Sequence, residues 1–150
     1  ITQNVDNLHQ DSGLSSADIT EIHGNATFAL CLNCNEKIDL GLIHEEFKET
    51  NKPPLCNSCN GYVKTATISF GQPMPENEMQ RAQLESLKAD LFIVVGSSLV
   101  VFPAASLPLV AKENGAKLVI INQEKTDFDD LADLVINDSI SKTFNEAINQ

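Results

Sequence analysis

The chain has 150 residues, 42% of them hydrophobic, and its formal net charge is −11 at pH 7. A chain of this length can bury one modest core, and it has no apolar stretch of the ~20 residues that a transmembrane helix needs. Nucleic-acid binding through phosphates is disfavoured because it requires a basic face, whereas ten Lys and Arg stand against 21 Asp and Glu. The composition therefore indicates a soluble globular protein with no membrane or direct nucleic-acid partner.

The beginning of the chain has no sign of a secretory leader. It starts with Ile1 rather than Met, without a basic-then-apolar stretch, and its first residues are typical of the end of a buried strand. We therefore expect the chain to be a fragment of a longer protein. Reduced cysteines and the missing leader together predict a cytoplasmic location.

Four cysteines occur as two C-x-x-C pairs, Cys31 with Cys34 and Cys56 with Cys59, with about 21 residues between the pairs. This spacing is close to that of four-cysteine zinc sites. Four thiolates would complete a tetrahedral shell and leave no position for water, so the predicted Zn²⁺ is structural. Two disulfides are the alternative, which suits a chain without secretory features poorly. A redox C-x-x-C site lacks its expected strand context.

The C-terminal half has the pattern of a βαβ unit. Residues 91–96 and 117–122 are short apolar runs that predict buried parallel strands. Between them, residues 103–114 have helical spacing and end before Gly115, a helix stop signal. Further helices are predicted at 39–49, 76–89 and 139–148, and a further strand at 133–136.

Polar residues follow three of the predicted strand ends, at 3–6, 96–98 and 122–124. Ligands of open α/β sheets bind outside the carboxyl ends of the strands. We therefore expect these three segments to converge on one crevice. The Gly-Ser-Ser turn at 96–98 would allow close approach of a ligand to the backbone, and Asn122 or Glu124 would suit ribose hydroxyls.

Several short motifs occur in a fixed order across nearly the whole chain. They are TQNVDNLH at residues 2–9, EIHG at 21–24, the two C-x-x-C pairs, SFG at 69–71, GSSLVV at 96–101 and IN at 121–122. Together they resemble the sirtuins, a family of NAD-dependent protein lysine deacylases. The resemblance implies an α/β fold, a partial doubly wound, Rossmann-like parallel sheet with a small four-cysteine zinc-binding module inserted. Residues 1–24 and 68–150 would form the NAD-binding catalytic domain, and residues 25–67 the module.

The resemblance also implies a role for each matching residue. His23 matches the catalytic general base, which removes a proton from a ribose hydroxyl after the acyl oxygen has attacked the anomeric carbon of NAD. Asn4 and Asp6 match catalytic positions of the nicotinamide and ribose pocket, where Asp6 would hold the carboxamide. The full set of implied cofactor-binding residues is Gln3, Asn4, Val5, Asp6, Gly96, Ser97, Ser98, Asn122, Gln123, Glu124, Ser139 and Ile140.

An acyl-lysine protein or peptide is the implied substrate, bound as an added β-strand between two segments. The matching substrate-binding residues are Phe70, Gly71, Val100 and Val101. The chain departs from the family at Gln72, where many members have Glu, which could change peptide preference. It also lacks the glycine-rich pyrophosphate loop that normally precedes the TQN motif, so we expect weak or no activity from the isolated chain.

Two other functions stay open at this stage. Mono-ADP-ribosyl transfer would use the same pocket and the same cleavage of the nicotinamide bond with a different acceptor. A noncatalytic zinc-bearing interaction module is the second alternative. The presence of His23, Asn4 and Asp6 together argues against it, since a binding-only protein needs none of the three.

Overall fold

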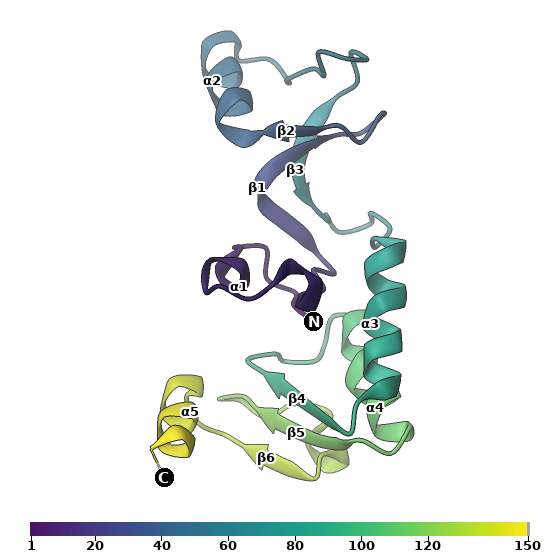
Figure 1. Cartoon of the computed structure of the whole chain (residues 1–150), viewed down its shortest axis with the longest axis vertical. Helices are drawn as coiled ribbons and strands as arrows, with labels where there is room; N and C mark the ends of the chain where they lie inside the picture. Colours follow the sequence, from purple (N-terminus) through teal and green to yellow (C-terminus); the bar gives the residue numbers. More distant parts are fainter. Residues whose placement is uncertain (150) are drawn as a thin grey trace. The chain divides into compact units, whose positions relative to one another are not determined.

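The protein, described here by a computed structural model covering residues 1–149, divides into two compact units, Ile1–Met79 and Gln80–Gln150 (Figure 1). The boundary lies within helix α3 (Glu76–Lys88). The division into residues 1–24 with 68–150 and a module at 25–67 stays a prediction.

The first unit contains a three-stranded antiparallel sheet in the order β2-β1-β3. The strands are β1 (Gly24–Cys31), β2 (Lys37–Asp39) and β3 (Val63–Thr67). Helix α2 (Leu40–Thr50) follows β2 directly, and the Asp39 carboxylate caps it by accepting a 3.1 Å hydrogen bond from the Leu42 N–H. This helix was predicted at 39–49 and is confirmed, whereas the antiparallel sheet was not predicted.

The core of this sheet is small. Its buried members are Ala29, Cys31, Cys56 and Val63, with Ile38, Leu40 and Ile43 packed against them. Two of the four buried members are cysteines, so little apolar area holds this sheet together. A domain of this kind commonly depends on a bound metal for its stability.

The N-terminal segment runs beside the start of β1. Thr2 forms a parallel bridge with Glu21, and the chain between them forms α1 (Leu8–Asp11) and η1 (Ser16–Asp18). Buried Ile19 and Ile22 lie on this return path. The first residues thus form one isolated bridge, with Glu21 as the partner of Thr2, and not the end of a buried strand that was predicted.

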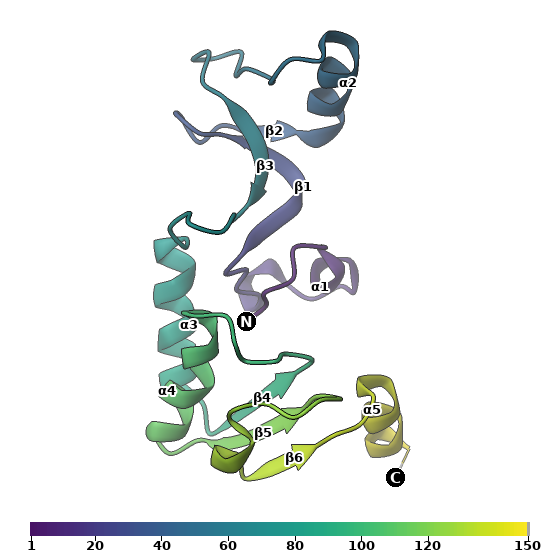
Figure 2. The ribbon, with the colours of Figure 1, turned by 180° about the vertical axis from the view of Figure 1, so that it is seen from behind.

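The second unit contains the predicted parallel sheet, with strands in the order β4-β5-β6. These are β4 (Leu91–Val95), β5 (Lys117–Ile121) and β6 (Leu134–Ile136). The connection from β4 to β5 contains η2 (Ala104–Ser106) and α4 (Leu107–Glu113), and α4 packs against both strands (Figure 2). After η3 (Asp129–Leu131) and β6, the chain ends in α5 (Ile140–Ile148), capped by the Ser139 hydroxyl. The predicted βαβ unit and flanking helices are confirmed.

One face of strand β4 is buried and the other is not. Val94, Leu118 and Ile120 form the core with Leu99 and Ala105. The alternate residues of β4 point the other way, and Leu91, Ile93 and Val95 are 52%, 46% and 42% exposed. The prediction that residues 91–96 form a fully buried strand is therefore wrong for one face, because α4 covers the opposite one.

Asp133 connects this sheet to α4. Its carboxylate accepts hydrogen bonds from Lys112 Nζ (2.5 Å), the Leu118 N–H (2.8 Å) and Lys117 Nζ (3.1 Å). These donors, with Lys112 the strongest contributor, hold the pKa of Asp133 below its usual range. The carboxylate thus stabilises the fold when ionised, and this stabilisation is lost as the pH falls below about 4.

We expect the variant Asp133→Asn to unfold about 2–4 °C below wild type at pH 7. The difference should shrink progressively below pH 4, because Asp133 of the unfolded chain then binds a proton while the lowered pKa keeps the folded carboxylate ionised. Thermal unfolding followed by circular dichroism at several pH values measures this. Glu85→Gln is the matched control, because the Glu85–Lys88 ion pair is exposed and worth little. A difference in Tm that is independent of pH would contradict the assignment.

Candidate functional site

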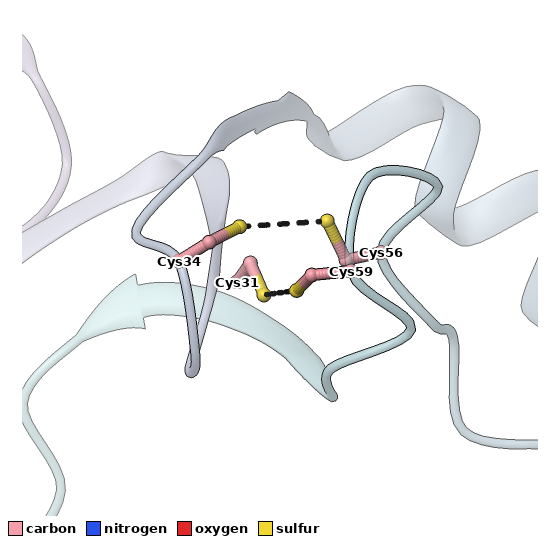
Figure 3. Close-up of side chains that lie close together, drawn as sticks. All are labelled: Cys31, Cys34, Cys56 and Cys59. Atoms are coloured by element: carbon pink, nitrogen blue, oxygen red, sulfur yellow. Dashed lines mark hydrogen bonds between the residues drawn. The ribbon is translucent and has the colours of Figure 1, made fainter.

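The four predicted metal ligands converge on one point in the first unit. Cys31 lies at the end of β1, Cys34 in the following turn, and Cys56 and Cys59 in the turn before β3 (Figure 3). Their four Sγ atoms all lie within 4.8 Å of one another. The Cys31–Cys59 and Cys34–Cys56 sulfur pairs are 3.4 and 3.7 Å apart.

These distances fit a zinc ion and exclude disulfides in this structure. A tetrahedral site with Zn–S bonds of ~2.3 Å requires sulfur–sulfur distances of about 3.8 Å, whereas a disulfide requires ~2.05 Å. All four cysteines are free. The thiols of Cys31, Cys34, Cys56 and Cys59 are therefore positioned to bind Zn²⁺ in a closed, structural site.

The backbone favours the thiolate form of Cys31, whereas neighbouring side chains raise the pKa of Cys34, Cys56 and Cys59. The Cys34 N–H lowers the pKa of Cys31 to about 6, with a further contribution from the Asn33 N–H, which lies 3.4 Å from the same sulfur. Since only the thiolate binds a metal, donors pointing at sulfur prepare Cys31 for coordination at neutral pH.

His23 lies immediately before β1 and is half-buried. Its Nδ1 atom is 3.1 Å from the main-chain oxygen of Gln3. A carbonyl oxygen can only accept a hydrogen bond, so Nδ1 must be the protonated nitrogen in this contact. In the neutral ring the lone pair is then on Nε2, which can accept a proton from a ligand.

The segment that carries the other predicted pocket residues is paired to the chain around His23. Thr2 N–H donates to Thr20 O (2.8 Å), Ile22 N–H to Thr2 O (3.1 Å) and Ala26 N–H to Val5 O (2.8 Å). Gln3, Asn4 and Val5 therefore lie on a segment held beside His23 at both ends, and Asp6 follows it directly. The structure brings these five predicted residues together in the first unit.

Gly24 makes this arrangement possible. Its φ is +76°, and a Cβ atom at this position would come within 2.0 Å of the Ala66 carbonyl oxygen. Any other residue would therefore push β1 away from β3, where Gly24 pairs with Thr67. The His-Gly order thus positions His23 at the start of a closely paired strand.

Asn25 was missed by the sequence analysis. It is a buried polar residue two positions after His23, and its side chain contacts Asn7, Glu21 and Thr27. The only local signal is an Asn two residues before a Thr, which is common to many turns. The contacts with Asn7 and Glu21 come from tertiary structure.

The second unit brings together the residues predicted to surround the adenosine half. Val95, Ile121 and Ile136 are in register at the carboxyl ends of the three strands, so Gly96 and Asn122 follow neighbouring ends. Gly96 has φ +64°, and a Cβ there would approach Ile140 Cδ1 to 2.9 Å. Ser139 is the N-cap of α5, directly before Ile140. Ser97, Ser98, Gln123 and Glu124 lie in the turns after β4 and β5.

The predicted substrate residues lie in both units. Phe70 and Gly71 belong to the first, where the Phe70 side chain is 99% exposed. Val100 and Val101 belong to the second and are also exposed. Gln72 is engaged locally, because its amide oxygen accepts from the Ser69 N–H at 3.2 Å. The roles of these residues, and the convergence of the three polar segments on one crevice, stay predictions.

Comparison with known proteins decides the family. The model of the Sir2 family matches residues 1–103. The chain belongs to the Sir2 family. This sirtuin chain is 53% identical over 143 residues to an NAD-dependent protein deacetylase of Rhodopseudomonas palustris, covering 95% of the chain and 56% of that protein. It is 43% identical over 150 residues to an NAD-dependent protein deacetylase of Caldivirga maquilingensis, covering 100% and 57%.

Solved sirtuin structures share the fold. Sir2Tm bound to a propionylated peptide matches with a TM-score of 0.91 and 36% identity, covering 99% of this chain and 61% of that one. Sir2 with a p53 peptide and NAD⁺ gives the same TM-score and identity, covering 99% and 60%. The predicted α/β fold is thus confirmed, and this sirtuin chain spans about 56% of the length of the Rhodopseudomonas relative.

Replacing Cys56 by Ser should release the metal from this sirtuin chain, because three thiolates and a hydroxyl bind zinc far more weakly than four thiolates. We expect the zinc content to fall from about one ion per chain to near zero, and amide exchange to accelerate through residues 25–67. Elemental mass spectrometry and hydrogen exchange measure the two effects. Asn57→Ala, an exposed change in the same turn, is the control. Stoichiometric zinc in the Cys56 variant would contradict the four-cysteine assignment.

Proposed function

We propose that the whole protein containing this chain is an NAD-dependent protein lysine deacylase. It would transfer the acyl group of an acyl-lysine protein or peptide to ADP-ribose and release nicotinamide. The observation that carries the proposal is the orientation of His23, whose Nδ1 atom faces the Gln3 carbonyl at 3.1 Å. This contact leaves Nε2 as the proton acceptor that the proposed reaction needs.

The relatives support the same chemistry. Proteins 40–54% identical to this chain are named NAD-dependent protein deacetylases. Solved structures of Sir2 contain a p53 peptide with NAD⁺, or a deacetylated p53 peptide with 3′-O-acetyl ADP-ribose. NAD as co-substrate and an acyl-lysine peptide as substrate are proposed for this protein by that similarity.

The residues of this chain have distinct proposed roles. His23 would accept the proton of a ribose hydroxyl. Asn4 and Asp6, held beside it by the pairing of residues 2–5 with 20–26, would orient the nicotinamide and ribose. NAD supplies the activated bond to nicotinamide, and the Gly96 turn with Asn122 and Ser139 would contact its adenosine half. Phe70, Gly71, Val100 and Val101 would line the acyl-lysine site.

The proposed location is the cytoplasm. Four free cysteines arranged for a metal require a reducing compartment to stay unoxidised. Among residues 1–149, no helix has both the length and the apolar character to cross a membrane. Fractionation of cells, followed by detection of the protein with an antibody, tests the location; recovery in a secreted fraction would overturn it.

We expect His23→Ala in the whole protein to lower kcat for deacylation about 10²–10⁴-fold, because the general base is removed. Zinc content and Tm should stay close to wild type. His44→Ala, an exposed histidine on α2, is the matched control and should keep full activity. Mass spectrometry of an acetyl-lysine peptide and of the nucleotide product measures the reaction.

The products distinguish the proposed function from its alternatives. Free lysine together with O-acetyl-ADP-ribose supports deacylation. An ADP-ribosylated acceptor would indicate mono-ADP-ribosyl transfer instead. No release of nicotinamide from NAD by the wild-type protein would favour a noncatalytic interaction module. Full activity of the His23 variant would overturn the assignment of the general base.

A further inference from the structure

Asn25 is a buried polar side chain beside the proposed active site. It is 3% exposed and follows His23 by two residues, at the start of β1. A buried amide is costly unless its donors and acceptors are satisfied. Its hydrogen bonds therefore show which neighbouring segments the side chain connects.

The amide of Asn25 uses its full hydrogen-bonding capacity. Its Oδ1 atom accepts from the Thr27 N–H at 2.8 Å and from Thr27 Oγ1 at 2.6 Å. Its Nδ2 atom donates to Glu21 Oε1 at 2.8 Å and to Asn7 Oδ1 at 3.0 Å. A main-chain N–H can only donate, so Oδ1 must face Thr27 and the two donors must face Glu21 and Asn7.

The contact with Asn7 is also fixed in direction. Asn7 Nδ2 donates to Asp11 Oδ1 at 2.7 Å, which leaves Asn7 Oδ1 to accept from Asn25. Asn7 has φ +66°, a left-handed conformation that the chain adopts directly after Asp6. The amide of Asn25 thus secures a turn whose backbone is intrinsically unfavourable for most residues.

Asn25 is the link between this turn and the strand after His23. The other described hydrogen bonds of residues 6–8 are local, such as Leu8 N–H to Asp6 Oδ1 at 3.1 Å and Asp11 N–H to Asn7 O at 3.0 Å. Main-chain pairing to the strand reaches only as far as Val5. Position 6 therefore lies between the last backbone contact and the Asn25 contact.

We propose that Asn25 is a positioning residue for the reaction, which fixes Asp6 relative to His23 by tying Asn7 to β1. The proposal rests on the deacylase function proposed above. Asn25 is 3% exposed and its amide is bonded within the chain, so its effect would pass through the placement of Asp6. Small displacements of pocket groups can lower turnover substantially.

The first test is kinetic and uses the whole protein. Asn25→Asp keeps the shape and the acceptor for Thr27, but places a carboxylate oxygen against Glu21 Oε1 and Asn7 Oδ1. We expect kcat for nicotinamide release to fall about 10–100-fold, with zinc content unchanged. Thr27→Val is the matched control, because it removes one hydrogen bond to the same Asn25 without touching the Asn7 turn; its kcat should stay within about twofold of wild type.

A double-mutant cycle tests the link itself. Asn7→Gly keeps the left-handed backbone and removes the acceptor for Asn25. If the two residues act through one contact, the double variant Asn7→Gly with Asn25→Asp should be no slower than the slower single variant. Effects that multiply would overturn the link. A kcat for Asn25→Asp no lower than that of Thr27→Val would overturn the positioning role.

Hydrogen exchange separates this proposal from the proposed function. In the same samples, the amides of Leu8, Asp11 and Ser12 should exchange faster in Asn25→Asp than in Thr27→Val. This readout does not depend on turnover, so it judges the contact even if wild type releases no nicotinamide and the deacylase proposal fails. Unchanged exchange would overturn the tie between Asn25 and the turn. Faster exchange with unchanged kcat in an active protein would overturn the positioning role.

Discussion

The cluster of four thiols is the constraint on which the antiparallel sheet of the first unit depends. The buried cluster of this sheet consists of few residues, and two of them, Cys31 and Cys56, belong to the thiol cluster. Burial of so little apolar surface contributes little against the entropy of ordering the chain. A zinc ion bound by all four thiolates would supply the missing free energy, since metal binding that requires the folded arrangement stabilises it.

Strand β1 connects the thiol cluster to the proposed catalytic residue, His23. It ends at Cys31, inside the thiol cluster, and begins at Gly24, the residue after His23. Its pairing with β3 fixes both ends, because Cys31 is in register with Val63 and Gly24 with Thr67. A structural metal that takes no part in the chemistry can therefore still determine where the imidazole lies. The absence of a side chain at Gly24 is the condition for that pairing.

Sequence patterns predicted the helices and strands that depend on residues close together in the chain. The helices predicted at 39–49 and 76–89 and the strands predicted at 91–96 and 117–122 follow from periodicity and stop signals within a few positions, and the structure has each of them. The paired C-x-x-C spacing was sufficient for the metal site because each pair forms its own turn. Asn25 was different: its partners Asn7 and Glu21 are brought to it by the return of the chain through α1 and η1, which no local pattern encodes.

The error on β4 has a related cause. A continuous apolar run indicates burial on both faces, but burial depends on what lies against each face. Leu91, Ile93 and Val95 are apolar and yet about half exposed. An apolar run thus shows that both faces of a strand could be buried, but not that both are. Among the described residues of the second unit, helix α4 covers one face of β4 only.

The orientation of the His23 ring depends on a main-chain atom, the Gln3 carbonyl oxygen. Within residues 3–6, orienting the base is therefore separate from contacting a ligand. The Gln3 carbonyl determines which imidazole nitrogen carries the proton, and that carbonyl is present whatever side chain residue 3 has. The side chains of Asn4 and Asp6 are therefore able to serve a ligand without also having to orient the base. In many active sites a carboxylate orients the histidine, and its replacement changes tautomer and charge together. Here a change at Asn4 should report on ligand contacts alone, so long as the pairing of residues 2–5 with 20–26 is intact. A change at Asp6 would also remove its 3.1 Å hydrogen bond from the Leu8 N–H.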